Sequence, residues 1–165
     1  MPVITKSLMV LGAALALATS AYAASGPIVV HDMSLDMAKA AAEATLSECR
    51  SKGFHTAAVV VDRAGQVIVT LRDELATSQM TEMSRRKAYT ARMFRRSTLE
   101  WAKRTHDDPS IAAQRDLPDV LALAGGVPIK MGEETIGAVG SAGSTLEQDD
   151  TCARTGAAKA EAMMK

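Results

Sequence analysis

Two β-branched segments separated by a very short turn constrain the fold more than any other feature of the sequence. Residues 56–61 form a continuous apolar run, and residues 66–71 alternate between apolar and polar side chains. Between them stand residues 62–65, where Gly65 can adopt the positive φ that a tight turn requires. Only antiparallel strands can be joined by so short a connection, because parallel strands need a crossover of a dozen or more residues. The sequence therefore predicts a β-hairpin within an antiparallel sheet.

An amphipathic helix is expected before this hairpin. Apolar side chains recur at the three- and four-residue steps of a helical stripe, at Leu35, Ala38, Ala42, Leu46 and Cys49. Ser34 offers a side-chain N-cap, and Gly53 suits the left-handed position that ends many helices. The pattern predicts a helix between these two residues, with Cys49 on its buried face.

The remaining segments complete the order of elements. A helical stripe predicts one long helix from Ser78 to about Lys103, and a turn led by Gly132 separates two short strands. Asp149 and Asp150 are expected to open a final helix, where the helix dipole favours acids. The order predicts an α+β fold with an antiparallel sheet of about five strands, helices packed against it, and the N- and C-terminal helices flanking.

Residues 1–23 have the three-part pattern of a secretory signal peptide. Lys6 supplies a positive charge, residues 8–18 are apolar, and small residues stand at Ala21 and Ala23. The apolar run is shorter than the ~20 residues that span a bilayer. Cleavage is therefore expected after Ala23, which places the mature protein in the periplasm or outside the cell.

Residues 24–165 are expected to form a single domain that does not insert into a membrane after cleavage. The chain has 19 basic and 19 acidic side chains, so its formal net charge is zero. A neutral protein lacks long-range attraction for a phosphate backbone, and nucleic acid is not an expected partner.

Two cysteines, Cys49 and Cys152, stand far apart in the sequence. An oxidising compartment permits a disulfide between them. Two buried free thiols are the alternative, because the sequence does not reveal the Cα separation that a bridge requires. Both alternatives stay open at this point.

Four stretches, in their order and spacing, resemble one known family. They are residues 58–65, 87–91, 125–129 and 136–140. Together they are similar to the GlcG/HbpS haem-binding family, which includes the haem-binding C-terminal domain of certain corrinoid adenosyltransferases. The chain departs from the family at residues 71–75, where Leu-Arg-Asp-Glu-Leu replaces an Arg-Met-Asp-Gly-Ala run.

The resemblance implies haem binding in a homo-oligomer and, in some members, slow haem degradation. The expected function is that of an exported haem-binding protein for haem capture, buffering or sensing. The alternative is an enzyme or accessory protein that acts on a small organic acid. A third hypothesis is a purely structural oligomer. No nucleophile elbow, HExxH motif or phosphate loop is present in the sequence, so no catalytic residue is nominated.

Lys87 and Thr90 are the first candidate ligand contacts. They interrupt an otherwise apolar stripe of the long helix. A buried ammonium is costly unless it is paired, so an anion is expected beside Lys87. One hypothesis is a ligand carboxylate such as a haem propionate, with Thr90 donating beside it. The alternative is a protein acid such as Asp73, or a lysine that reaches water.

Arginines and histidines supply the other candidates. Arg72 is expected at the rim of a ligand site, with a salt bridge to Asp73 as the alternative. A run of arginines on the long helix, which includes Arg92, forms a solvated face or meets an anionic ligand. The haem iron could be ligated by His31, His55 or His106. We favour His31 as the metal ligand, because it stands next to a helix end that is fixed in space.

Overall fold

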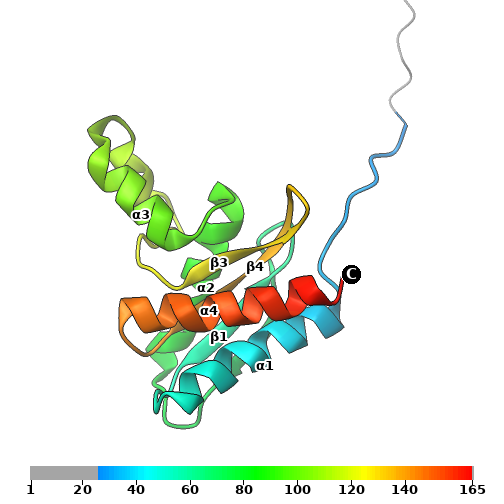
Figure 1. The fold of residues 1–165 in the computed structure, drawn as a ribbon. Coiled ribbons are helices and arrows are strands. Elements are labelled where there is room, and N and C mark those ends of the chain that lie inside the picture. The colour runs from blue at the N-terminus through cyan, green and yellow to red at the C-terminus, as the bar shows by residue number, and fades with distance from the viewer. Residues whose placement is uncertain (1–25, 165) are drawn as a thin grey trace, which may run out of the picture.

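Four antiparallel strands form the centre of the molecule, in the order β2-β1-β4-β3. The computed structural model describes residues 26–164, so the predicted signal peptide lies outside the described residues. The strands are β1 Ala57–Val61, β2 Val67–Arg72, β3 Gly126–Met131 and β4 Glu134–Ala142. The α+β class is confirmed, and four strands are found where about five were expected (Figure 1).

The predicted hairpin joins β1 to β2. Gly65 has a φ of 82°, and its amide donates to the Asp62 carbonyl at 3.1 Å. The Asp62 carboxylate accepts the Gln66 amide at 2.8 Å, which closes the turn. The turn residues that predicted the hairpin, Asp62 and Gly65, therefore form it in the structure.

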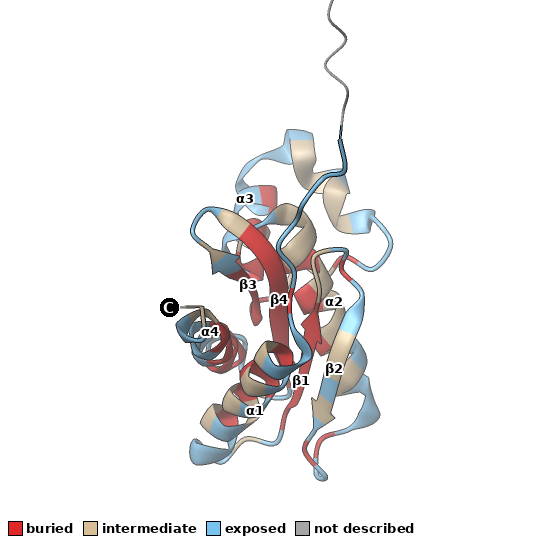
Figure 2. Ribbon diagram, turned by 90° about the vertical axis from the view of Figure 1, so that its right-hand side faces the viewer, coloured by how far each residue is buried: buried red, intermediate tan, exposed pale blue. Residues whose placement is uncertain are grey.

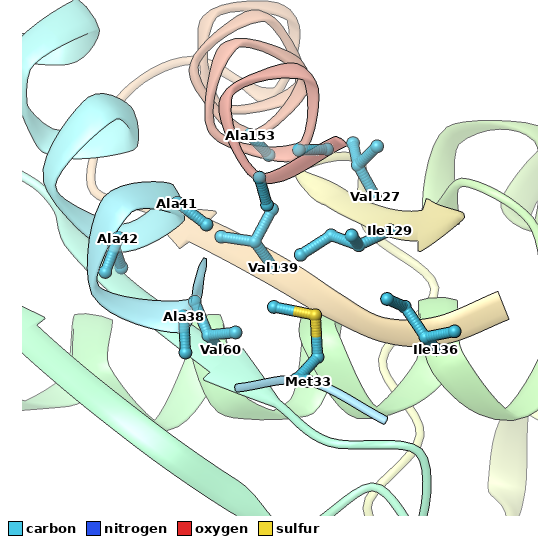
Figure 3. Packing of buried hydrophobic residues seen from close by; sticks show 13 residues of the cluster. Met33, Ala38, Ala41, Ala42, Val60, Val127, Ile129, Ile136, Val139 and Ala153 are labelled. Atoms are coloured by element: carbon cyan, nitrogen blue, oxygen red, sulfur yellow. The ribbon is translucent and has the colours of Figure 1, made fainter. Parts of the chain in front are cut away.

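Helices cover both faces of the sheet (Figures 1 and 2). On one face, α1 Leu35–Ser51 and α4 Leu146–Ala162 pack on Val60 and Val139 (Figure 3). On the other face, α2 Ser78–Phe94 packs on Val59 and Val61. Because successive side chains of β1 face opposite layers, all of its residues are buried. This two-sided burial explains why its sequence is continuously apolar.

Small residues let α1 and α4 approach each other closely. Gly156 of α4 faces Ala41 and Thr45 of α1, and a Cβ atom at this position would overlap both residues. The same two helices are joined by a disulfide between Cys49 and Cys152, with a Cα–Cα distance of 5.6 Å. The open question of the cysteines is thus answered in favour of the bridge.

The prediction of a single long helix from Ser78 to about Lys103 is wrong. Arg95 adopts a left-handed conformation, with φ 54°, and ends α2. The Ser97 hydroxyl then accepts the Glu100 amide and caps a separate helix, α3 Thr98–Asp107. Phe94 and Trp101 both lie on the predicted apolar stripe, and their ring centroids stack 4.4 Å apart across the break. The periodicity of the sequence therefore did not reveal that the helix ends between them.

Two smaller features complete the described chain. A 3₁₀ segment, η1 Pro109–Asp116, follows α3 and lies with it beyond the edge of the sheet (Figure 1). The last helix begins at Leu146, before the predicted start at Asp149, because the Thr145 hydroxyl caps it by accepting the Gln148 amide. Within residues 26–164, no helix has the length and apolar character needed to cross a bilayer.

Candidate functional site

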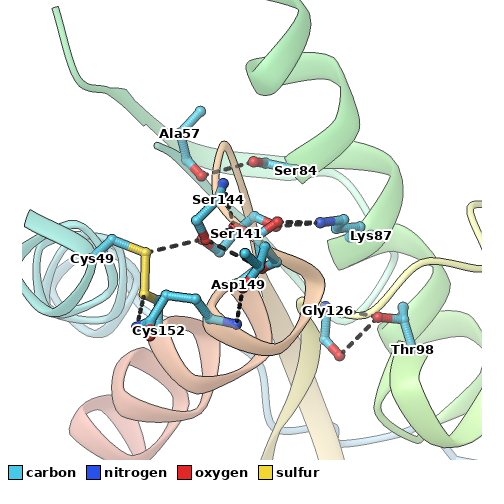
Figure 4. A network of polar contacts seen from close by, with 12 residues as sticks. Cys49, Ala57, Ser84, Lys87, Thr98, Gly126, Ser141, Ser144, Asp149 and Cys152 are labelled. Carbon is cyan, nitrogen blue, oxygen red and sulfur yellow. Dashed lines mark hydrogen bonds and ion pairs between the residues drawn. A yellow bond between two sulfur atoms is a disulfide. The ribbon is translucent and has the colours of Figure 1, made fainter. Parts of the chain in front are cut away.

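Lys87 is fully buried and is bound to protein groups. Its Nζ atom donates to Asp149 Oδ2 at 2.7 Å and to the Ser141 carbonyl at 2.8 Å (Figure 4). Burial lowers the pKa of Lys87, and the Asp149 carboxylate opposes this effect. The alternative of a protein acid beside the ammonium is confirmed, but Asp73 was the wrong acid. A propionate is not needed to account for the burial of Lys87.

Thr90 is also fully buried and bridges two segments of the chain. Its hydroxyl donates to the Arg86 carbonyl at 2.7 Å and accepts the Leu121 amide at 2.9 Å. Lys87 and Thr90 therefore attach α2 to the loop before β3 and to α4. Their role as ligand contacts stays a prediction.

Two stretches that carried the family resemblance meet at this place. A Cβ atom at Gly126 would overlap the Lys87 carbonyl group, and Gly125 has a φ of 117°. The glycine pair therefore allows the backbone that enters β3 to lie directly against α2. This close approach gives the Gly-Gly motif a structural purpose.

Arg72 and Asp73 do not form the salt bridge considered above. Arg72 donates to the Ala76 carbonyl, whereas the Asp73 carboxylate accepts from Arg50 Nε at 2.5 Å and pairs with His55 Nδ1 at 3.0 Å. A hydrogen bond from the Leu75 amide, together with Arg50, lowers the pKa of Asp73 to about 2. Arg72 thus lies at the rim of a saturated polar cluster.

His31 has the arrangement of an oriented imidazole. Its Nδ1 atom lies 2.8 Å from Glu134 Oε2, and the other oxygen of Glu134 accepts from Arg63. The His31 bond, followed by the Arg63 bond, lowers the pKa of Glu134. The His31 side chain is 60% exposed. With Nδ1 held by a carboxylate, the Nε2 atom is the ring nitrogen available to a metal.

A hollow of about 320 Å³, which we call the basic hollow, adjoins this pair. It is lined by Arg63, Arg92, Met93, Arg95, Glu133, Glu134 and Thr135. The buried Arg92 Nε atom has no hydrogen-bond partner among the described residues. Burial and then the like charges of Arg63 and Arg95 lower the pKa of Arg92. The basic hollow therefore holds a guanidinium that an anion would stabilise.

The candidate residues fall at opposite ends of the sheet. Arg72 is paired with Ala57, which faces Ala142 at the end of β4, whereas His31 contacts Glu134 at its start. Eight residue steps along a strand span roughly 27 Å. Glu134, the partner of His31, thus lies in the same lining as Arg63 and Arg92, whereas Arg72 lies at the other end of the sheet.

Sequence reasoning missed Glu134 and Arg63 as site residues. Both stand in or next to turns, where charged side chains are common and carry no signal of their own. Glu134 pairs with His31 across 103 positions and with Arg63 across 71. No local pattern predicts pairings of this range.

A second hollow, which we call the apolar groove, has a volume of about 430 Å³. It lies between α3, the loop before β3 and the first turns of α4. It is lined by Leu99, Ala102, Ala122, Leu123, Ala124, Leu146, Glu147, Asp150, Thr151 and Arg154. This lining contains two acids, one base and no histidine. Among residues 26–164, no three His, Cys, Asp or Glu side chains gather as a metal-ion site.

Comparisons with known proteins agree on one family. The family model described as "Haem degrading protein HbpS-like" matches residues 33–158. A crystal structure of HbpS is 36% identical, covers 82% of this chain and 96% of its own, and has a TM-score of 0.76. Protein ORFY of Klebsiella pneumoniae is 25% identical, with coverages of 84% and 97% and a TM-score of 0.79. A PduOC–haem complex, at 23% identity, coverages of 77% and 94% and a TM-score of 0.69, shares the fold.

Proposed function

We propose that this chain, which belongs to the HbpS-like family of haem-degrading proteins, binds haem beside His31, at the basic hollow. The observation that carries the proposal is the His31–Glu134 pair, whose glutamate shares the basic hollow with Arg92, and the buried Arg92 Nε atom has no hydrogen-bond partner within residues 26–164. A haem needs an axial ligand for iron and cations for its propionates, and this end of the sheet offers both.

His31 is the proposed axial ligand. Glu134 accepts from Nδ1 and holds the imidazole in one orientation, which leaves Nε2 for the iron. Of the other two histidines, His55 pairs with the Asp73 carboxylate. His106 lies in the last turn of α3 and does not line the basic hollow. This interpretation keeps the histidine that the sequence favoured.

Arg92 and Arg95 are the proposed partners of the propionates. Arg63 already binds Glu134, whereas Arg92 has a buried Nε–H group with no protein acceptor among the described residues. The three arginines and two glutamates of the lining leave one net positive charge. The apolar groove offers one base against two acids, so it would repel propionates.

Exposed apolar residues next to His31 suggest what contacts the macrocycle. Ile28 and Val29 are each 88% exposed. Apolar surface of this kind packs favourably against a porphyrin face. We propose a homo-oligomer, as the family resemblance implies, in which a second copy of the chain covers the other haem face.

The proposed role is haem capture, buffering or sensing outside the cytoplasm. The leader pattern of residues 1–23 supports export, and so does the Cys49–Cys152 disulfide, because such bridges persist in oxidising compartments. Bound haem supplies an iron centre for ligand and redox chemistry, while the residues of this chain bind and orient it.

Haem titration of His31→Ala tests the proposal. We expect the Soret maximum of the complex to shift and the affinity to fall by about 10–100-fold, and Glu134→Gln to show a smaller loss in the same direction. His106→Ala is the matched control and should behave as the wild type does. An unchanged Soret maximum and affinity in His31→Ala would overturn the axial assignment.

The action on a small organic acid remains the second candidate function. Arg92 favours it, because a guanidinium with an unpartnered Nε–H group can bind any carboxylate. Lys87 no longer supports it, since its ammonium already has a protein carboxylate. Saturable binding of acetate or succinate to a protein that shows no Soret band on haem titration would favour this alternative.

A further inference from the structure

One residue that lines the apolar groove, Asp150, has a buried oxygen atom that the described part of the fold leaves without a hydrogen-bond partner. Asp150 is 6% exposed, and its Oδ1 atom is buried without a hydrogen-bond partner among the described residues. The other oxygen of the carboxylate accepts from Arg154 Nε at 2.6 Å. A buried acceptor without a donor is costly, and a ligand donor that reached this oxygen from the groove would remove that cost.

The walls of the groove limit what that ligand can be. Six of the lining residues are apolar, namely Leu99, Ala102, Ala122, Leu123, Ala124 and Leu146. They come from α3, from the loop before β3 and from the start of α4. Its volume of about 430 Å³ exceeds the ~150 Å³ that accommodates benzene in an engineered cavity.

The charges next to Asp150 favour a donor over an acceptor. Glu147 and Asp150 stand against Arg154, which leaves one net negative charge. An anionic ligand would be repelled, whereas an N–H or O–H group would satisfy Oδ1.

We propose that the apolar groove binds a small, mainly apolar molecule of one or two rings that donates one hydrogen bond from an N–H or O–H group to Asp150 Oδ1. The site is separate from the basic hollow, and the two linings share no residue. Asp150 is a binding residue of this site, and the apolar residues exclude water from the bond, which strengthens it.

Three bicyclic probes of similar shape test the proposal by calorimetry. Indene has no donor, indole has a neutral N–H group, and 2-aminoindane has an ammonium group. We expect indole and 2-aminoindane to bind saturably, and at least one of them at least about tenfold more tightly than indene. A stronger response to the amine would identify a cationic ligand, and a stronger response to indole a neutral one.

Variants locate the binding. Asp150→Leu, which removes both acceptor oxygens, should abolish the preference for the donor-bearing probes, while Glu147→Gln, which removes a neighbouring charge, should keep it. Ala102→Phe fills the groove and should abolish binding of all three probes, and saturating indole should leave the haem titration unchanged. Equal affinity for all probes in the wild type, no saturable binding, or undiminished binding to Ala102→Phe would overturn the proposal.

Discussion

The two ends of the sheet differ in how the charge of one cation, Lys87 or Arg92, is paired. At the end of β4, Lys87 is buried and bound to both Asp149 and the Ser141 carbonyl. At the start of β4, His31 is exposed and the buried Arg92 Nε atom has no partner among the described residues. We call these the closed end and the open end. A saturated buried pair holds the fold together, whereas an unsatisfied cation beside an oriented imidazole is available to a ligand.

Lys87 and Arg92 differ from what their places in the sequence suggest. Lys87 attracted attention because a charge on an apolar stripe is unusual, but its partner is the protein itself. Arg92 was one of several arginines in a run and looked like part of a solvated face. Lys87 has a protein partner for its charge, whereas the Arg92 Nε atom has none among the described residues, which makes Arg92 the better ligand candidate.

Breaking the closed end should have the largest effect on stability. Lys87→Met removes the ammonium and leaves the buried Asp149 carboxylate with only its hydrogen bonds from Ser144. We expect the free energy of unfolding to fall by about 3–5 kcal/mol. Urea denaturation measures it, and the double variant Lys87→Met/Asp149→Leu should recover part of the loss, because no buried charge is left unpaired although the acceptor of Ser144 is removed. A loss below about 1 kcal/mol in the single variant would argue against a structural pair.

Removing the disulfide should have the second-largest effect on stability, and this bridge lies at the same end of the sheet. Replacing Cys49 and Cys152 with serine releases the bridge between α1 and α4. We expect a loss of about 2–4 kcal/mol, because the unfolded chain regains a long loop. Thiol titration of the denatured, non-reduced wild type is the companion measurement, and it should find no free thiol. Two free thiols would contradict the bridge.

Acid should weaken the closed end within a defined pH window. The pKa of Asp73 is lowered from 3.8 to about 2, so its contribution to stability is fully present above pH 3.8. That contribution is lost as the pH falls towards 2, because the unfolded carboxylate takes up its proton first. Denaturation at several pH values measures the slope. Asp73→Asn should flatten it, whereas Asp36→Asn, an exposed control, should not; equal slopes for the two variants would exclude Asp73 as the cause.

The smallest effect is expected at the open end in the absence of ligand. Arg92→Met keeps the apolar stem and removes an unsatisfied charge. The stability of the apo protein should therefore change by less than about 1 kcal/mol or increase. Thermal denaturation checks this expectation. A large loss would mean that Arg92 is bound within the protein as Lys87 is.

Local patterns predicted much of the fold, and tertiary contacts decided the rest. The turn at Gly65 and the helix that Ser34 caps follow from neighbouring residues, so both were predictable. The break at Arg95 was not, because a left-handed arginine carries no signal comparable to that of glycine.

The candidate site was predictable only in part for the same reason. His31 was favoured because it adjoins a helix end, but the groups around it come from distant segments. Glu134 stands 103 positions away, and the partner of Lys87 stands 62 positions away. Such pairs depend on how the strands and helices pack in three dimensions, which no single segment of the sequence reveals.

Haem affinity in two variants tests the contrast between the ends most directly. Arg92→Met changes the open end, and the double variant Lys87→Met/Asp149→Leu changes the closed end without leaving a buried charge unpaired. We expect Arg92→Met to weaken haem binding by about tenfold, as for the loss of one charge-assisted hydrogen bond, and the folded double variant to bind as the wild type does. The opposite result, a full loss in the double variant and none in Arg92→Met, would contradict the account.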